Sequence, residues 1–251
     1  MERQRFERPK VSRATEKLID REDSETLERL EKSVASLVSD MKERINGAEY
    51  ELVIGEDASG RLPALMLGTV LKDVYESRGI RAPMVRFLTS SRPTKESGDI
   101  WEKRTAAVRE ALSEIKKTFD ESGRNGKVLL VTDVIDTGNS MEGLLRAVQE
   151  AGMAPEVATV ALLKGDSDSY TRAEAFEKHW GVNVYWTQNH LTDVFRNRLS
   201  GVTKSKDGAY AVANDRTVGI VRAARERVIN AAHRIAADFI AESPDGLLPR
   251  A

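Results

Sequence analysis

Residues 128–140 have the sequence VLLVTDVIDTGNS and indicate the fold more clearly than any other segment of the chain. The run from Lys127 to Asp133 is almost continuously apolar, which is typical of a central parallel strand covered on both faces. Asp136 follows three residues after Asp133, and small hydroxyl- and amide-bearing residues come next. Helical periodicity then runs from Met141 to Ala151. We therefore predict a buried strand, a polar loop and a helix in this order.

Strands and helices alternate on both sides of this segment. Further short apolar runs predict strands at 50–55, 83–88, 157–163 and 182–186. Further helices are predicted at 61–76, around 108–119 and around 171–179. This alternation favours an α/β fold with a doubly wound, mainly parallel sheet.

Two longer helices flank this core. Apolar residues at three-four spacing predict one helix from Asp23 or Ser24 to Ile45, and another from residue 214 or 215 to 241. We therefore predict an N-terminal helical extension at 1–48, a core domain at 49–201 and a C-terminal helical extension at 202–251. The extensions could form a hood over the core or the contact of a possible homodimer.

Composition excludes several classes of protein. The 251 residues contain 39 Lys and Arg against 40 Asp and Glu, so no overall basic field favours nucleic-acid binding. The absence of cysteine excludes disulfides, zinc–thiolate sites, iron–sulfur clusters and a cysteine nucleophile. The longest apolar stretch, Leu62 to Leu71, is about half of the ~20 residues that a membrane-spanning helix needs. We expect a soluble cytoplasmic protein.

The polar loop after the central strand is suited to a phosphate group. Backbone N–H groups from Thr137 to Ser140 lie at the positive end of the predicted helix, and Gly138 permits close approach of a ligand. Asp133 and Asp136 cannot bind phosphate themselves. Their carboxylates suit sugar hydroxyls, a magnesium-bound water or a developing positive charge.

With these residues, the segment resembles the 5-phosphoribosyl-1-pyrophosphate (PRPP) motif of type I phosphoribosyltransferases. The resemblance implies that Asp136, Thr137, Gly138, Asn139 and Ser140 hold the ribose 5-phosphate. It implies that Asp133, with Thr132 beside it, binds the ribose hydroxyls. In purine-specific members the acid at the Asp136 position lies near the base and can act as general base, so Asp136 and Asp133 are the candidate catalytic residues. Thr132 departs from the family pattern, which has an acid there.

The loop of sequence GEDASGRLP at residues 55–63 follows the first predicted strand. Taken alone, it is typical of an ordinary strand–helix turn. In the resembling family this position is the pyrophosphate loop, which implies that Asp57, Ser59, Gly60 and Arg61 bind the diphosphate.

The polar segment 89–99 shows no periodicity. It is either an ordinary exposed loop or, as in the resembling family, a mobile loop that closes over PRPP. In the second case Ser91, Arg92 and Lys95 belong to the closing loop, and the two cations reach the diphosphate.

The end of the last predicted strand contains two aromatic residues. Family members place base recognition there, which implies that Tyr185 or Trp186 stacks on the base and that Gln188 or Asn189 bonds its edge. The alternative is that the aromatic side chains belong to the core. The three histidines show no metal-ligand spacing.

The resemblance implies a pentosyltransferase that transfers a phosphoribosyl group between PRPP and a nitrogenous base and releases pyrophosphate. Mg²⁺ would be bound through the PRPP diphosphate. A purine, a pyrimidine or another amine could be the acceptor. The alternative is a non-catalytic protein of the same fold that senses PRPP or a nucleotide, and the replacement of the first acid by Thr132 favours this alternative.

Overall fold

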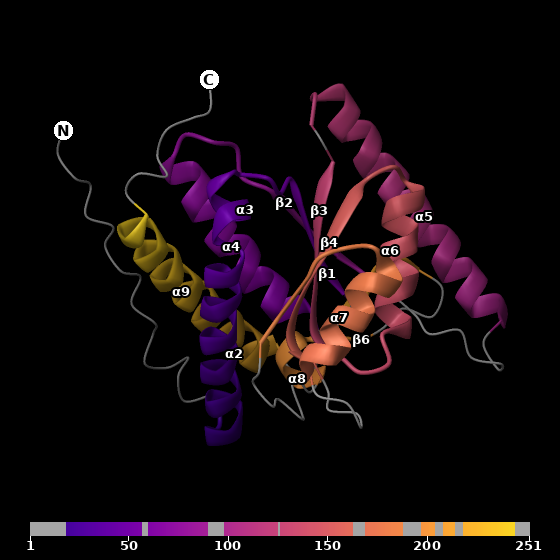
Figure 1. The fold of residues 1–251 in the computed structure, drawn as a ribbon. Coiled ribbons are helices and arrows are strands. Elements are labelled where there is room, and N and C mark those ends of the chain that lie inside the picture. The colour runs from indigo at the N-terminus through magenta and orange to yellow at the C-terminus, as the bar shows by residue number, and fades with distance from the viewer. Residues whose placement is uncertain are drawn as a thin grey trace.

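The structure, a computed structural model, describes residues 19–56, 60–89, 98–124, 126–162, 169–187, 197–203, 208–213 and 218–243. Five parallel strands form one sheet in the order β2-β1-β3-β4-β5 (Figure 1). Their bounds are β1 Leu52–Glu56, β2 Met84–Leu88, β3 Lys127–Ile135, β4 Ala154–Leu162 and β5 Val184–Trp186. The predicted α/β class and parallel sheet are confirmed.

Helices connect successive strands, and further helices precede β1 and follow β5 in the chain. The connecting helices are α4 Arg61–Ser77, α5 Gly98–Glu121, α6 Asn139–Glu150 and α7 Ser169–Trp180. The terminal helices are α2 Arg21–Asp40, α3 Lys42–Asn46 and α9 Val218–Glu242. The predicted N-cap of the first helix is wrong: Asp20 caps α2 by accepting a hydrogen bond from the Asp23 N–H at 2.9 Å. No described helix is both long and apolar enough to cross a membrane.

The sheet separates two core clusters, as a doubly wound fold requires. The first core cluster joins one face of the sheet to α2, α4 and α9, and the second joins the other face to α5, α6 and α7. Figure 1 shows these two helical layers on opposite sides of the sheet. Leu30 of α2 and Ala224 of α9 are fully buried in the first cluster. The terminal helices therefore complete the core of the sheet domain.

A short segment after β5 was not predicted from the sequence. It contains α8 Asn197–Ser200 and an antiparallel pair of two-residue strands, β6 Val202–Thr203 and β7 Val212–Ala213. Thr89, directly after β2, donates its N–H to the Ala209 carbonyl and its hydroxyl to the Gly208 carbonyl, both at 2.7 Å. The segment that follows β5, one edge strand of the sheet, is therefore hydrogen-bonded to the end of β2, the opposite edge strand.

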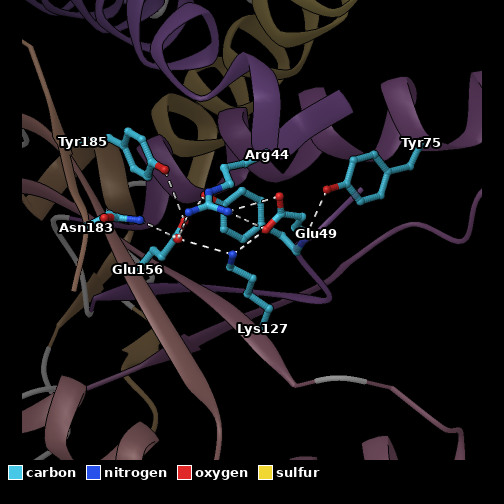
Figure 2. Close-up of polar contacts among 8 residues, drawn as sticks. Arg44, Glu49, Tyr75, Lys127, Glu156, Asn183 and Tyr185 are labelled. Atoms are coloured by element: carbon cyan, nitrogen blue, oxygen red, sulfur yellow. Dashed lines mark hydrogen bonds and ion pairs between the residues drawn. The ribbon is translucent and has the colours of Figure 1, made fainter. Parts of the chain in front are cut away.

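A buried carboxylate organises the amino edge of the sheet, where the parallel strands begin. Glu156 of β4 accepts hydrogen bonds from the Tyr50 hydroxyl at 2.5 Å and the Asn183 amide at 2.9 Å. It also pairs with Lys127 of β3 at 3.3 Å and Arg44 of α3 at 3.4 Å (Figure 2). One carboxylate therefore connects α3 to the residues at or just before the starts of β1, β3 and β5.

Glu49 extends this network toward the solvent. Its carboxylate lies 2.5 Å from Lys127 and 3.0 Å from Arg44, so two acids share two cations. Burial opposes ionisation of Glu49, but the hydrogen bonds from Lys127 and Arg44 outweigh it and lower the pKa of this carboxyl. The amino edge is therefore held together by an approximately neutral set of charges.

Two buried tyrosines accompany the network. Burial, followed by the hydrogen bond to Glu156, raises the pKa of Tyr50 far above its ordinary range. Burial likewise raises the pKa of Tyr75, whose hydroxyl accepts the Tyr50 N–H at 3.2 Å. Both hydroxyls therefore remain protonated in the folded protein at pH values that ionise an exposed tyrosine.

Stability should fall steeply at alkaline pH for this reason. A raised folded-state pKa stabilises the fold below the unfolded pKa of about 10, and this contribution is lost as the pH rises above it. Each such tyrosine should contribute a loss of about 1.4 kcal/mol per pH unit above that point. Urea unfolding at several alkaline pH values should show a shallower dependence for Tyr50→Phe than for the parent. Tyr210→Phe, at a side chain that is 53% exposed, should leave the slope unchanged; equal slopes in all three proteins would contradict the assignment.

Candidate functional site

The ends of β1 and β3 meet at the carboxyl edge of the sheet, opposite the amino edge. These two central strands are neighbours, with Gly55 paired to Val131. The chain leaves β1 toward β2 on one side, whereas β3 continues toward β4 on the other. Ligands of open parallel sheets bind where the connections diverge in this way. The loops after β1 and β3 are therefore the candidate site.

The loop from β3 to α6 brings together the residues predicted to bind phosphate. Gly138 is the N-cap of α6 in the left-handed conformation, with φ of 79°, and its carbonyl accepts the Glu142 N–H at 2.9 Å. No described side chain caps this helix. Its first-turn N–H groups therefore lie at a helix end without a side-chain cap from the described residues, which is the arrangement that binds anions. Thr137 and Asn139 on either side are exposed.

Gly138 is required by packing as well as by its backbone conformation. Phe176 and Trp180 of α7 stack with ring centroids 4.7 Å apart. A Cβ atom at Gly138 would lie 2.9 Å from Phe176 Cε1 and 2.9 Å from Trp180 Cζ2. The aromatic pair therefore packs directly against the backbone of the β3–α6 loop and fixes its position.

Arg172 of α7 is a site neighbour that sequence reasoning missed. Its guanidinium donates to the Asp136 carbonyl, and Arg172 Nη2 lies 3.7 Å from Asp136 Oδ1. The guanidinium also lies over the Phe176 ring, 5.8 Å from its centroid. No local pattern could have identified this residue, because 36 positions separate it from Asp136.

The two carboxylates of the motif have different environments. Asp133 is only 8% exposed, and its Oδ1 accepts the Val134 N–H at 2.7 Å and the Thr132 hydroxyl at 3.4 Å. The Asp136 side chain is 63% exposed. Thr132, which is buried, therefore orients Asp133, whereas Asp136 is open to a ligand.

Strands β3 and β4 are both irregular near Asp133. Side chains of a regular strand alternate between faces, yet Val131 and Val134 of β3 both contact the first core cluster. The adjacent residues Val160 and Ala161 of β4 do the same. The Thr159 hydroxyl bonds the Ala161 carbonyl at 2.9 Å. The alternation of side chains between the two faces of the sheet is therefore interrupted at neighbouring positions of β3 and β4. Asp133 lies at this interruption.

The loop after β1 approaches β3 through Gly60. A Cβ atom at Gly60 would lie 2.5 Å from the Val131 carbonyl oxygen and 2.7 Å from the Glu56 backbone nitrogen, so no larger residue fits. Arg61 begins α4, and its guanidinium lies 4.4 Å from the centroid of the Phe87 ring. The structure thus places Gly60 beside β3 and the Arg61 guanidinium against Phe87 of β2, while Asp57 and Ser59 lie outside the described residues.

The other predicted elements have separate outcomes. Ser91, Arg92 and Lys95 of the predicted closing loop lie outside the described residues, as do Gln188 and Asn189. The Tyr185 hydroxyl lies 3.4 Å from Glu156 and belongs to the amino-edge network (Figure 2). Trp186 packs against the second core cluster. The structure therefore does not bring Tyr185 to the β3–α6 loop, and the interpretation of this residue as a core aromatic describes it better.

Oxygen ligands are present at the carboxyl edge. Glu56, Asp133 and Asp136 supply carboxylates there, and such hard oxygen donors suit Mg²⁺. No group of three metal-ligating side chains occurs within the described parts of the chain. The described donors therefore fit a magnesium ion that a phosphorylated ligand carries.

The comparison with protein families agrees with this geometry. Residues 90–185 match the family model of the phosphoribosyl transferase domain. The matched region extends from the loop after β2 into β5 and includes the whole β3–α6 loop. No curated protein matches the chain.

Replacement of Gly138 should show how much the aromatic pair contributes to the loop. Gly138→Ala should lose stability through its positive φ, about 1–2 kcal/mol, and further through contact with the two rings. Gly123→Ala is the matched control, because Gly123 has φ of 67° and open space around it. Thermal and urea unfolding should therefore show the larger loss in Gly138→Ala. Equal losses would contradict the packing role of Phe176 and Trp180.

Proposed function

We propose that this protein transfers a phosphoribosyl group between PRPP and a nitrogenous base, with release of pyrophosphate, and the match of residues 90–185 to the phosphoribosyl transferase domain model supports this proposal. The observation that carries the proposal is the β3–α6 loop, which joins a helix N-terminus without a described side-chain cap to two unlike carboxylates. Strand β1 is the neighbour of β3, so in this proposal the segment that follows β1 holds a second phosphorylated group.

In this proposal the 5-phosphate of the ribose binds at the start of α6. The N–H groups from Thr137 to Ser140 and the hydroxyls of Thr137 and Ser140 donate to its oxygens. Gly138 gives the phosphate close access to the backbone. The Phe176–Trp180 pair packs against Gly138 and prevents the loop from moving toward α7. The 5-phosphate thereby fixes the position of the ribose ring.

The carboxylates act on the rest of the substrate. Asp133 accepts hydrogen bonds from the ribose hydroxyls, and Thr132 and the Val134 N–H hold it in place. A nitrogen of the base attacks C1, the bond from C1 to the diphosphate breaks, and Asp136 accepts the proton that the nitrogen loses. The ribose develops positive charge as this bond breaks, and nearby carboxylates stabilise that charge.

The leaving diphosphate binds at the other loop. In this proposal Arg61, the first residue of α4, contributes its charge to this loop, and the family resemblance adds Asp57, Ser59, Gly60, Arg92 and Lys95. A magnesium ion, when bound through the diphosphate oxygens, would neutralise the charge of the leaving group. Carboxylates at the carboxyl edge would bind its coordinated waters.

The direct experiment measures pyrophosphate release from PRPP and Mg²⁺ with a panel of purine and pyrimidine bases. We expect release only with an accepted base, together with formation of the matching nucleoside monophosphate. Binding of PRPP in calorimetry without turnover on any base of the panel would contradict the transfer proposal. Failure of PRPP to bind would contradict the site itself.

The unlike environments of the carboxylates predict different kinetic effects. Asp136→Asn should mainly lower kcat, by roughly 10²-fold or more if Asp136 is a general base. Asp133→Asn should mainly raise the KM for PRPP, because the amide still accepts the Val134 N–H but carries no charge. Asp120→Asn, at an exposed position on α5, is the control and should change neither constant. The same mild loss in both motif variants would contradict these roles.

A further inference from the structure

A cavity of about 390 Å³ opens at the amino edge of the sheet, opposite the candidate active site. It lies where β3, β4 and β5 begin and where α7 ends, and its polar lining comes from Lys127, Glu156, Glu177 and Asn183. Figure 2 shows Lys127, Glu156 and Asn183 around their shared contacts. None of these residues takes part in the proposed transfer reaction.

The cavity is unsuited to an anion. Lys127 contributes the one ammonium group among the side chains that line it, and two carboxylates already contact this group. Glu49 lies 2.5 Å from Lys127 Nζ and Glu156 lies 3.3 Å from it. Arg44 also pairs with Glu156, at 3.4 Å, so these two cations and two acids balance, and Glu177 leaves the lining with one net negative charge. The local electrostatics therefore favour a cation.

The hydrogen-bonding groups point to the same class of ligand. The Asn183 amide nitrogen donates to Glu156 at 2.9 Å, so its carbonyl oxygen is the group left to accept from a ligand. Glu177 Oε1 accepts the Val184 N–H at 2.9 Å, which fixes the side chain while a second carboxylate oxygen remains. Pro155 adds no N–H donor to the wall. The cavity thus offers mainly acceptors.

We propose that this cavity binds a small organic cation through an ammonium or guanidinium group held by the Glu177 carboxylate and by Oδ1 of the Asn183 side chain. Such a group carries several N–H donors and matches the acceptors in number and in charge. Coordination of a bare metal ion is less suitable, because no three ligating side chains gather within the described residues. The proposal does not depend on the transferase activity.

The test is calorimetric titration of the full chain with agmatine and putrescine at low ionic strength, with malonate as the anionic control. We expect saturable binding of at least one cation, weaker binding at high salt and no binding of malonate. Saturable binding of malonate, or the absence of saturable binding by both cations, would overturn the proposal.

Two variants locate the bound cation. Glu177→Gln should weaken binding roughly tenfold or more, since it removes a charge-assisted contact. Its amide oxygen can still accept the Val184 N–H, so circular dichroism should be unchanged. Glu174→Gln changes an exposed residue on the same helix outside the cavity lining and should bind as the parent does. An equal loss in both variants, or no loss in Glu177→Gln, would place the cation elsewhere and overturn the assignment.

Discussion

Burial of the Glu156 carboxylate is the constraint on which the arrangement of the sheet depends. An unpaired charge in this position would cost several kcal/mol, so the fold must bring donors to it from elsewhere in the chain. Tyr50, Arg44, Lys127 and Asn183 come from four separate segments and meet at this one group. A strand displaced by one residue would turn its donor to the opposite face. The network therefore selects one register at the amino edge.

The register at one edge determines what can meet at the other. With Leu52 beside Val128 and Lys127 beside Ala154, the ends of β1 and β3 are adjacent, and Gly60 lies against Val131 of β3. The separation of roles follows from this geometry. The amino edge contains buried charges that neutralise one another within the protein, whereas at the carboxyl edge the Asp136 side chain is 63% exposed, 3.7 Å from Arg172, near the positive end of α6.

Helix α7 contributes to both edges. Phe176 and Trp180 pack against Gly138, and Arg172 binds the backbone of Asp136. Glu177, the residue after Phe176, bonds the Val184 N–H and lines the amino-edge cavity. The position of the β3–α6 loop therefore depends on a helix whose contacting residue Arg172 follows Asp136 by 36 positions. This is why the motif alone describes the chemistry of the loop but not the support behind it.

The sequence by itself determined the class of fold and the strand–loop–helix order of the β3–α6 segment. Strand periodicity, helical periodicity and glycine positions are local properties, and the order VLLVTDVIDTGNS places acids, hydroxyls and a helix start within thirteen residues. Tertiary structure alone decided the partners of Glu156, the contact of Arg172 with Asp136 and the packing of both terminal helices on the sheet. It also decided the pairing of the two-residue strands β6 and β7, which are too short to show any period. The physical reason is sequence separation: Arg227 and Ser24 of the two terminal helices, for example, are bonded across 203 positions, and no local pattern specifies which distant groups burial will bring together.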